Sequence, residues 1–254
     1  MSVLIETSVG EFVVDLFVDK CPNTTNNFLK LCKLKSYNNN IFFKVEKDFV
    51  AQCGDPTGTG KGGESAFHQL YKLDPSLPGA SPERYIPDEI HPTLSHNRFG
   101  LLCMNNSAPN ENGSMFYITL RSNLEYLDGQ HTIFGEIAEE DGLKTLARIN
   151  ATFCDKDHRP YQNIRILHTV VLDDPFPDPL TEDKYPQSPD ISSDHLDVGR
   201  LRADEVWEDE YAGLSPAEVQ KRMREKEKKR RAAVLAMLGD LPDADVAPPE
   251  NVAF

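Results

Sequence analysis

Hydrophobic and polar residues alternate with a period of two in several short stretches of the chain. Residues 3–18, VLIETSVGEFVVDLFV, form two such runs around the turn sequence TSVG, which predicts a β-hairpin. Residues 41–53 alternate in the same way and predict one half-buried strand. The alternation returns from residue 100 and predicts strands in GLLCMNN, SMFYITL, EYLDGQHTIFGEI and RILHTVVL, the third entered through the Asp128-Gly129 turn.

Two other stretches have the three- and four-residue spacing of helices. Residues 21–33, CPNTTNNFLKLCK, offer Asn23 or Thr24 as an N-cap, and residues 142–152, GLKTLARINAT, place three apolar residues on one face. Many short strands separated by turns, together with two helices, predict a mainly β fold: a closed antiparallel barrel capped by helices. Because closure removes exposed sheet edges, this fold favours a monomer.

Two segments between these elements are rich in residues that interrupt regular structure. Residues 54–63, GDPTGTGKGG, contain five glycines and a proline and predict a tight loop, whose spacing does not match a phosphate-binding loop. Residues 68–97 contain five prolines and predict a long irregular excursion over the surface.

Composition and charge separate a body from a tail. Residues 1–172 carry 16 Lys and Arg against 21 Asp and Glu, whereas residues 173–254 carry 11 against 20, so the net charges are −5 and −9. Nothing in the body predicts an electrostatic surface for nucleic acid. No apolar run approaches the roughly 20 residues that span a bilayer, and the five scattered cysteines lack metal-ligand spacing, which predicts reduced thiols, no metal site and no membrane partner.

The tail divides into a linker and a helix. Residues 173–214 are acidic and proline-rich and predict a linker without a core of its own. A charged helix is predicted over 215–239, opened by the capping box of Ser215 and Glu218. Eight of the eleven residues from 221 to 231 are basic, which is typical of a solvated helix but also of a nuclear-localisation or RNA-contacting segment.

Three segments and their order resemble the cyclophilin family of peptidyl-prolyl cis-trans isomerases. They are FFKVEKDFVAQCGD (42–55), LLCMNNSAPNENGSMFYI (101–118) and LEYLDGQHTIFG (124–135), accompanied by the glycine-rich loop. The resemblance covers about residues 1–172. It implies a closed eight-stranded antiparallel barrel with two capping helices and a proline-binding groove on its outer face.

The reaction of this family needs no cofactor, metal or nucleophile. Rotation about a peptide bond faces a barrier of about 18–20 kcal/mol because the amide is conjugated. A catalyst must hold the proline ring in an apolar pocket and favour the twisted amide with hydrogen-bond donors already in place.

The resemblance assigns the groove residue by residue. It implies a proline pocket of Phe49, Val50, Tyr117 and Leu127 with His131 at the rim, Gln52 on the substrate backbone, and Asn106, flanked by Asn105 and Ser107, on the residue before proline. Tyr117 stands where the family has phenylalanine or a similar aromatic residue, and Val50 where it has methionine.

Three departures bear on activity. Lys44 occupies the position of the catalytic arginine, and a flexible ammonium does not replace a planar fork of donors. Tyr126 replaces the tryptophan that supports cyclosporin binding, and Met115 replaces a glutamine of the groove. We therefore expect retained binding of proline peptides, weak isomerase activity, and weak cyclosporin binding at most. A competent isomerase that compensates for Lys44, and an inert scaffold, are the alternatives.

The tail adds a second resemblance, to cyclophilins that carry an RNA-recognition motif. In that subgroup the motif begins where residues 240–254, DLPDADVAPPENVAF, end here, so the chain is expected to be part of a longer protein. This implies a nuclear protein of RNA processing or transcription, which contacts RNA through a domain beyond these residues.

Overall fold

The structure, a computed structural model, describes residues 1–180, 185 and 186 and contains one antiparallel sheet in that range. The eight strands are β1 (Ser2–Thr7), β2 (Gly10–Leu16), β3 (Lys44–Glu46), β4 (Val50–Cys53), β5 (Leu101–Met104), β6 (Phe116–Thr119), β7 (Ile133–Glu136) and β8 (Ile166–Val171). The helices are α1 (Pro22–Lys33), α2 (Ala66–Leu73), α3 (Glu140–Asn150) and the short 3-10 helix η1 (Glu125–Leu127).

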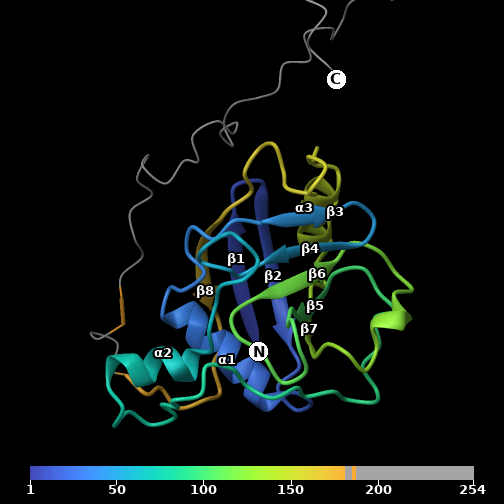
Figure 1. The fold of residues 1–254 in the computed structure, drawn as a ribbon. Helices are drawn as coiled ribbons and strands as arrows, with labels where there is room; N and C mark the ends of the chain where they lie inside the picture. Colours follow the sequence, from blue (N-terminus) through green and yellow to red (C-terminus); the bar gives the residue numbers. More distant parts are fainter. Residues whose placement is uncertain (181–184, 187–254) are drawn as a thin grey trace, which may run out of the picture. The chain divides into compact units, whose positions relative to one another are not determined.

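The sheet is curled, and its strand order is β3-β4-β6-β5-β7-β2-β1-β8 (Figure 1). The prediction of eight antiparallel strands is confirmed, but a closed barrel overstates the result. The two edge strands, β3 and β8, do not pair with each other directly. Instead, the segment before β3 meets the start of β8 through the isolated bridge Ile41↔Arg165 and through backbone bonds. The Asn39 amide donates to the Ile166 carbonyl, the Ile166 amide to the Asn40 carbonyl, and the Phe42 amide to the Ile164 carbonyl.

The stretch predicted as one strand over 41–53 is a hairpin of β3 and β4. Asp48 has φ +55°, which reverses the chain, and its amide donates to Asn150 Oδ1. Lys44 pairs with Gln52, and Val45 with Ala51. The alternation continues through the turn because both strands bury the same face of the sheet, so periodicity alone did not reveal the reversal.

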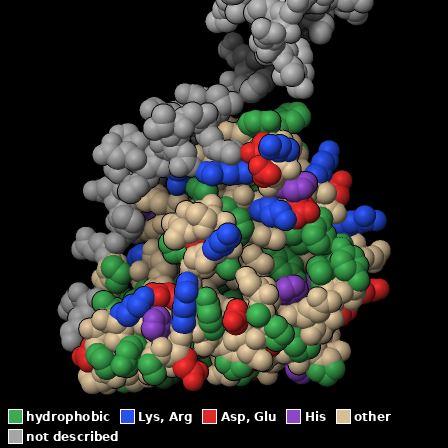
Figure 2. All heavy atoms as spheres, in the orientation of Figure 1, with side chains coloured by type: hydrophobic (Ala, Val, Ile, Leu, Met, Phe, Trp, Pro, Cys, Tyr) green, Lys and Arg blue, Asp and Glu red, His purple; other side chains and the backbone are tan. Residues whose placement is uncertain are grey.

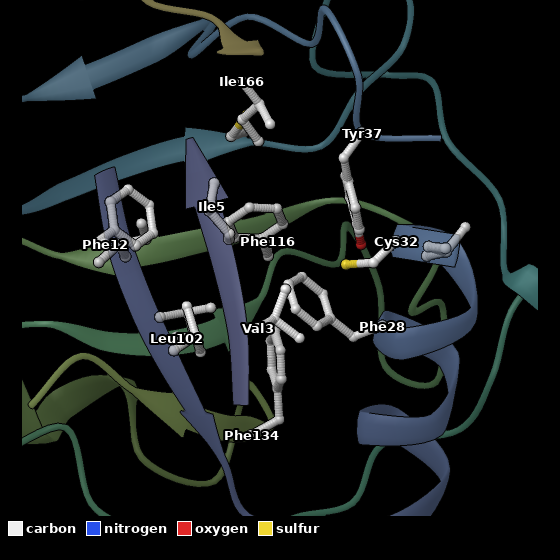
Figure 3. Packing of buried hydrophobic residues seen from close by; sticks show 14 of the residues in the cluster. Val3, Ile5, Phe12, Phe28, Cys32, Tyr37, Leu102, Phe116, Phe134 and Ile166 are labelled. Carbon is white, nitrogen blue, oxygen red and sulfur yellow. The ribbon is translucent and has the colours of Figure 1, made fainter. Parts of the chain in front are cut away.

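Helix α1 covers the inner face of the sheet, and its aromatic side chain anchors the core. The Phe28 ring lies 5.2 Å from that of Phe134, 5.7 Å from Phe116 and 5.3 Å from Tyr37, measured between centroids (Figure 3). All four are almost completely buried. Burial of one such ring stabilises the fold by about 1.5–3 kcal/mol, and paired rings add to this.

The start of α1 differs from the predicted cap. Cys21 is the N-cap residue and makes no side-chain cap bond, while Pro22 occupies the first turn. The orphan amides of Asn23 and Thr24 donate instead to the Glu89 carboxylate, at 3.1 and 2.7 Å. A distant acid thus takes the place of a local cap, which no local pattern could indicate.

The helix count also differs from the prediction. Helix α3 confirms the predicted helix at 142–152, but α2 lies partly in the segment predicted to be irregular. Ser65 caps it by accepting from the His68 amide, and the Ala66 amide donates to Asn27 Oδ1 on α1. Eight residues followed by several prolines give too short a periodic signal to outweigh the turn-rich composition.

The first residues of the predicted linker lie against α1. Asp174 and Asp178 form ion pairs of 2.7–3.0 Å with Lys30 and Lys33, and Phe176, Leu180 and Tyr185 pack on the core. We call residues 173–180 with 185 and 186 the C-terminal strap. The remaining linker, the helix predicted at 215–239 and residues 240–254 lie outside the described part of the chain.

Candidate functional site

Most of the predicted site residues meet on the outer face of the sheet, opposite α1. A second cluster of buried apolar residues lies there, and we call it the outer-face cluster. Its buried members are Val50, Leu101, Cys103, Tyr117, Leu124 and Ile133, with Phe17, Phe49, Leu94 and Leu127 partly buried against them. Figure 2 shows hydrophobic side chains gathered on the right of the drawn face, beside the loop that carries η1 in Figure 1.

Two of the aromatic side chains of this cluster make ring contacts with residues outside it. Phe49 enters β4 from the hairpin turn, and its ring stacks on that of Tyr126 in η1 at 6.3 Å with an interplanar angle of 16°. Tyr117 comes from β6, where it pairs with Gln52 of β4. Its ring meets that of His131 edge to face at 5.5 Å. The predicted apolar residues Phe49, Val50, Tyr117 and Leu127 therefore do come together.

Polar side chains line one edge of the cluster. Lys44 and Gln52 are neighbours across β3 and β4, and Asn105 Nδ2 lies 3.4 Å from Gln52 Oε1. The backbone amide of Asn105, which follows β5, donates to the carbonyl of Met115, which precedes β6. These groups form a row of donors and acceptors beside an apolar surface, an arrangement that can hold an extended peptide by its backbone.

Lys44 is held by a neighbouring acid. Its Nζ lies 2.6 Å from Glu46 Oε1, two residues along the same strand, and its side chain is 38% exposed. Because residues two apart in a strand point to the same face, the pair lies beside Gln52 rather than across the sheet from it. Glu46 was not predicted as a site residue, although its spacing from Lys44 in a strand could have indicated it.

Asn106 and His131 form the other polar edge. His131 Nδ1 lies 2.5 Å from Asn106 Oδ1, and Asn106 Nδ2 donates to Asp88 Oδ1 at 3.1 Å. Since the amide oxygen only accepts, Nδ1 of His131 carries the proton and Nε2 is left as an acceptor. Burial lowers the pKa of His131, the electrostatic interaction with His96 adds to this shift, and Asp88 opposes it. The imidazole is therefore neutral at physiological pH.

Two predicted residues, Ser107 and Met115, lie outside the outer-face cluster. Ser107 is exposed beyond the end of β5. Met115 is half-buried and precedes β6, and its backbone contact to Asn105 is its link to the polar row.

The glycine-rich loop is built around the buried carboxylate of Asp55. The amides of Thr57, Thr59, Gly60, Lys61 and Gly62 all donate to it, at 2.7–3.2 Å. Burial raises the pKa of this carboxyl, but the hydroxyl and amide of Thr57 and the loop amides outweigh it and lower the pKa. The loop amides thus bind the chain's own acid, which accounts for the tight loop and not for a phosphate site.

A polar cavity lies elsewhere in the molecule. Its volume is about 510 Å³, and Asn38, Asn40, Thr57, Arg159 and Arg165 are among its lining residues. It contains none of the predicted site residues. Within the described residues no His, Cys, Asp and Glu side chains cluster as a metal site would require, and no helix is long and apolar enough to cross a membrane.

A curled eight-stranded antiparallel sheet with an apolar cluster and a polar row on its outer face defines a cyclophilin-like protein. A family model described as cyclophilin type peptidyl-prolyl cis-trans isomerase/CLD matches residues 2–171. The chain belongs to the cyclophilin-type peptidyl-prolyl cis-trans isomerase family.

Known proteins of this family match the whole chain. The protein named peptidyl-prolyl cis-trans isomerase-like 4 from Homo sapiens is 48% identical over 254 residues, all of this chain and 49% of that protein. Its namesake from Cryptococcus neoformans is 49% identical over 256 residues, again all of this chain and 49% of that protein. The chain therefore spans about half the length of these relatives.

A solved structure confirms the fold of the body. The cyclophilin type peptidyl-prolyl cis-trans isomerase of Cryptosporidium parvum, crystallised in the presence of the dipeptide Ala-Pro, is 39% identical with a TM-score of 0.59. The match covers 68% of this chain and all of that one.

Proposed function

We propose that the outer-face cluster binds proline-containing segments of partner proteins and isomerises their X–Pro bonds slowly. The observation that supports this most directly is that Phe49, Tyr117 and Leu127 lie together beside the polar row of Gln52 and Asn105. The apolar side chains hold the proline ring, while the polar row fixes the peptide backbone. The Cryptosporidium parvum protein was crystallised in the presence of the dipeptide Ala-Pro, which supports the same substrate class.

Catalysis requires a donor that is favourable only when the amide is twisted. Lys44 is the candidate, but its ammonium already pairs with Glu46 at 2.6 Å. It must leave or share that partner to reach the substrate, and it lacks the rigid fork of an arginine. Both features support weak catalysis. The Glu46 pair also favours the second candidate function, a binding module with little turnover.

The proposal can be tested by NMR exchange spectroscopy, which measures cis-trans exchange in a tetrapeptide that contains one Ala-Pro bond. The full chain is added at catalytic concentration. Lys44→Arg should raise the exchange rate at least tenfold, whereas Lys47→Arg, an exposed lysine of the β3–β4 turn, should leave it unchanged. Wild-type turnover that Lys44→Arg does not raise would contradict the catalytic role of this position. Absence of peptide-induced shifts at Phe49, Gln52 and His131 would instead favour an inert scaffold.

For the whole protein we propose a nuclear role in RNA processing or transcription, with RNA bound by a domain beyond these residues. The support is the tail's resemblance to cyclophilins with an RNA-recognition motif, and the length of the relatives. Imaging of the tagged full-length protein tests the location. A submicromolar affinity of this chain alone for RNA, at physiological salt, would contradict the proposal that a domain beyond these residues binds the RNA.

Two further properties follow from the same proposal. Cyclosporin should bind weakly, because Tyr126 replaces tryptophan and is 64% exposed. The chain should be a monomer, which light scattering after gel filtration checks.

A further inference from the structure

A hydrogen-bonded chain of side chains runs beneath the outer-face cluster. The Tyr117 hydroxyl on β6 lies 2.8 Å from His96 Nε2, and the two rings are nearly parallel at 6.2 Å. His96 is completely buried, and its Nδ1 lies 2.6 Å from Asp128 Oδ1. The chain thus joins a rigid strand to the residue that ends η1.

Chemistry fixes the direction of these bonds. A carboxylate only accepts, so His96 Nδ1 donates to Asp128, and in the neutral imidazole Nε2 accepts from the Tyr117 hydroxyl. Asp128 also accepts from the His96 amide at 2.8 Å and from Ser95 Oγ at 2.6 Å. Every polar atom along the chain therefore has a partner, the condition under which a buried network stabilises a single geometry.

The turn at residues 124–129 depends on this support. Leu124, at the start of the turn, is buried and its amide donates to the His96 carbonyl, but none of the three residues of η1 that follow is buried, so packing alone holds this part of the turn weakly. Within the turn, the amides of Leu127 and Asp128 donate to the carbonyls of Leu124 and Glu125. The turn nevertheless carries Leu127, which packs on the outer-face cluster, and Tyr126, which stacks on Phe49.

We propose that Tyr117, His96 and Asp128 are positioning residues that hold the 124–129 turn against the sheet and so keep the proline site preformed. The proposal rests on the proposed function for the meaning of the site, but not for the existence of the chain. His96 touches no peptide because it is completely buried. The hydroxyl of Tyr117, at the position where the family has an aromatic residue such as phenylalanine, is the link that the sheet contributes.

Amide hydrogen exchange in the unliganded full chain tests the positioning role. Tyr117→Phe keeps the ring and removes only the hydroxyl. It should accelerate exchange of the Leu127, Asp128 and Gln130 amides about tenfold relative to the amides of β1 and β2, which corresponds to about 1.4 kcal/mol for one buried hydrogen bond. Asp128→Ala, which cuts the chain at its exposed end, should act on the same amides.

Tyr37→Phe is the matched control. It removes another buried hydroxyl, which donates to the Ser114 carbonyl at 3.0 Å on the opposite side of the sheet. It should leave exchange in the 124–129 turn unchanged. Equal exchange of the turn amides in Tyr117→Phe and Tyr37→Phe would overturn the proposal.

Titration with the Ala-Pro tetrapeptide then separates this inference from the proposed function. If Tyr117→Phe only makes the proline site less preformed, it should weaken peptide binding by at most the same tenfold factor. A larger loss would mean that the hydroxyl contacts the peptide directly, and it would refute the positioning role. If the wild type binds no peptide, the proposed function fails, while the exchange measurement still decides whether the chain holds the turn.

Discussion

The C-terminal strap should stabilise the fold well beyond what surface ion pairs provide. The side chain of Lys30 is 3% exposed and that of Asp174 7%, and their charged atoms lie 3.0 Å apart. Asp178 pairs with the same lysine at 2.9 Å, and the Phe176 carbonyl accepts from it at 3.4 Å. Replacing both acids, Asp174→Asn with Asp178→Asn, leaves a buried ammonium without an opposite charge.

The expected loss follows from burial. Removing the partner of a buried charge costs about 3–5 kcal/mol, because the remaining ion is not hydrated. The pairs of Lys33 with Asp178 are more exposed, at 22% and 38%, and add at most about 1 kcal/mol. For a chain of this size, the main loss lowers the thermal midpoint by roughly 6–20 °C.

Far-UV circular dichroism of the full chain is the suitable assay, because the single tryptophan, Trp207, lies outside the described residues. Asp173→Asn is the control, since Asp173 is exposed and the substitution removes one negative charge of the strap, against two in the double variant. A double variant within about 1 kcal/mol of this control would refute the reasoning. It would mean that Lys30 finds water or another acceptor when the two carboxylates are gone.

The pH dependence gives a second check on the strap. Burial raises the pKa of Asp174, but bonds from Lys33, the Phe176 amide and Lys30 outweigh it, so the pKa lies below its ordinary value of 3.8. The folded state therefore binds this proton less readily than the unfolded state. The contribution is fully present above pH 3.8 and is lost as the pH falls through the folded pKa. The difference between wild type and double variant should shrink over that range.

Two other predictions concern His131 and the glycine-rich loop. His131 should titrate below 6.5 in an NMR pH series because burial lowers its pKa. Its contribution to the stability of the fold is therefore present above pH 6.5 and is lost as the pH falls through the folded pKa. A pKa above 6.5 would contradict a neutral His131 bonded to Asn106. Gly54→Ala should destabilise the fold by more than about 2 kcal/mol in urea unfolding, because Gly54 has φ +91° and a Cβ would overlap the Ser114 carbonyl. A loss of stability below about 0.5 kcal/mol would contradict this prediction and show that the loop can shift.

The pattern of residues along the chain was enough to predict the class of fold and most of the site's members. Alternation at period two indicated the strands, because one face of each is buried, and the ordered motifs around Phe49, Asn106 and His131 indicated the family. These signals are local, so the chain carries them wherever its segments lie. They could not separate the β3–β4 hairpin from one strand, since both bury the same face, nor find α2 in a proline-rich segment.

The contacts between residues far apart in the chain were seen only in the folded protein. The Glu89 carboxylate at the start of α1, the Asp174–Lys30 pair and the Tyr117–His96–Asp128 chain join residues 21 to 144 positions apart. No periodicity records such contacts, because they depend on how the sheet curls and not on neighbours along the chain. The environment of Lys44 combines both kinds of information: its motif named the position and the strand spacing could have indicated Glu46, while the β3–β4 hairpin placed the pair beside Gln52.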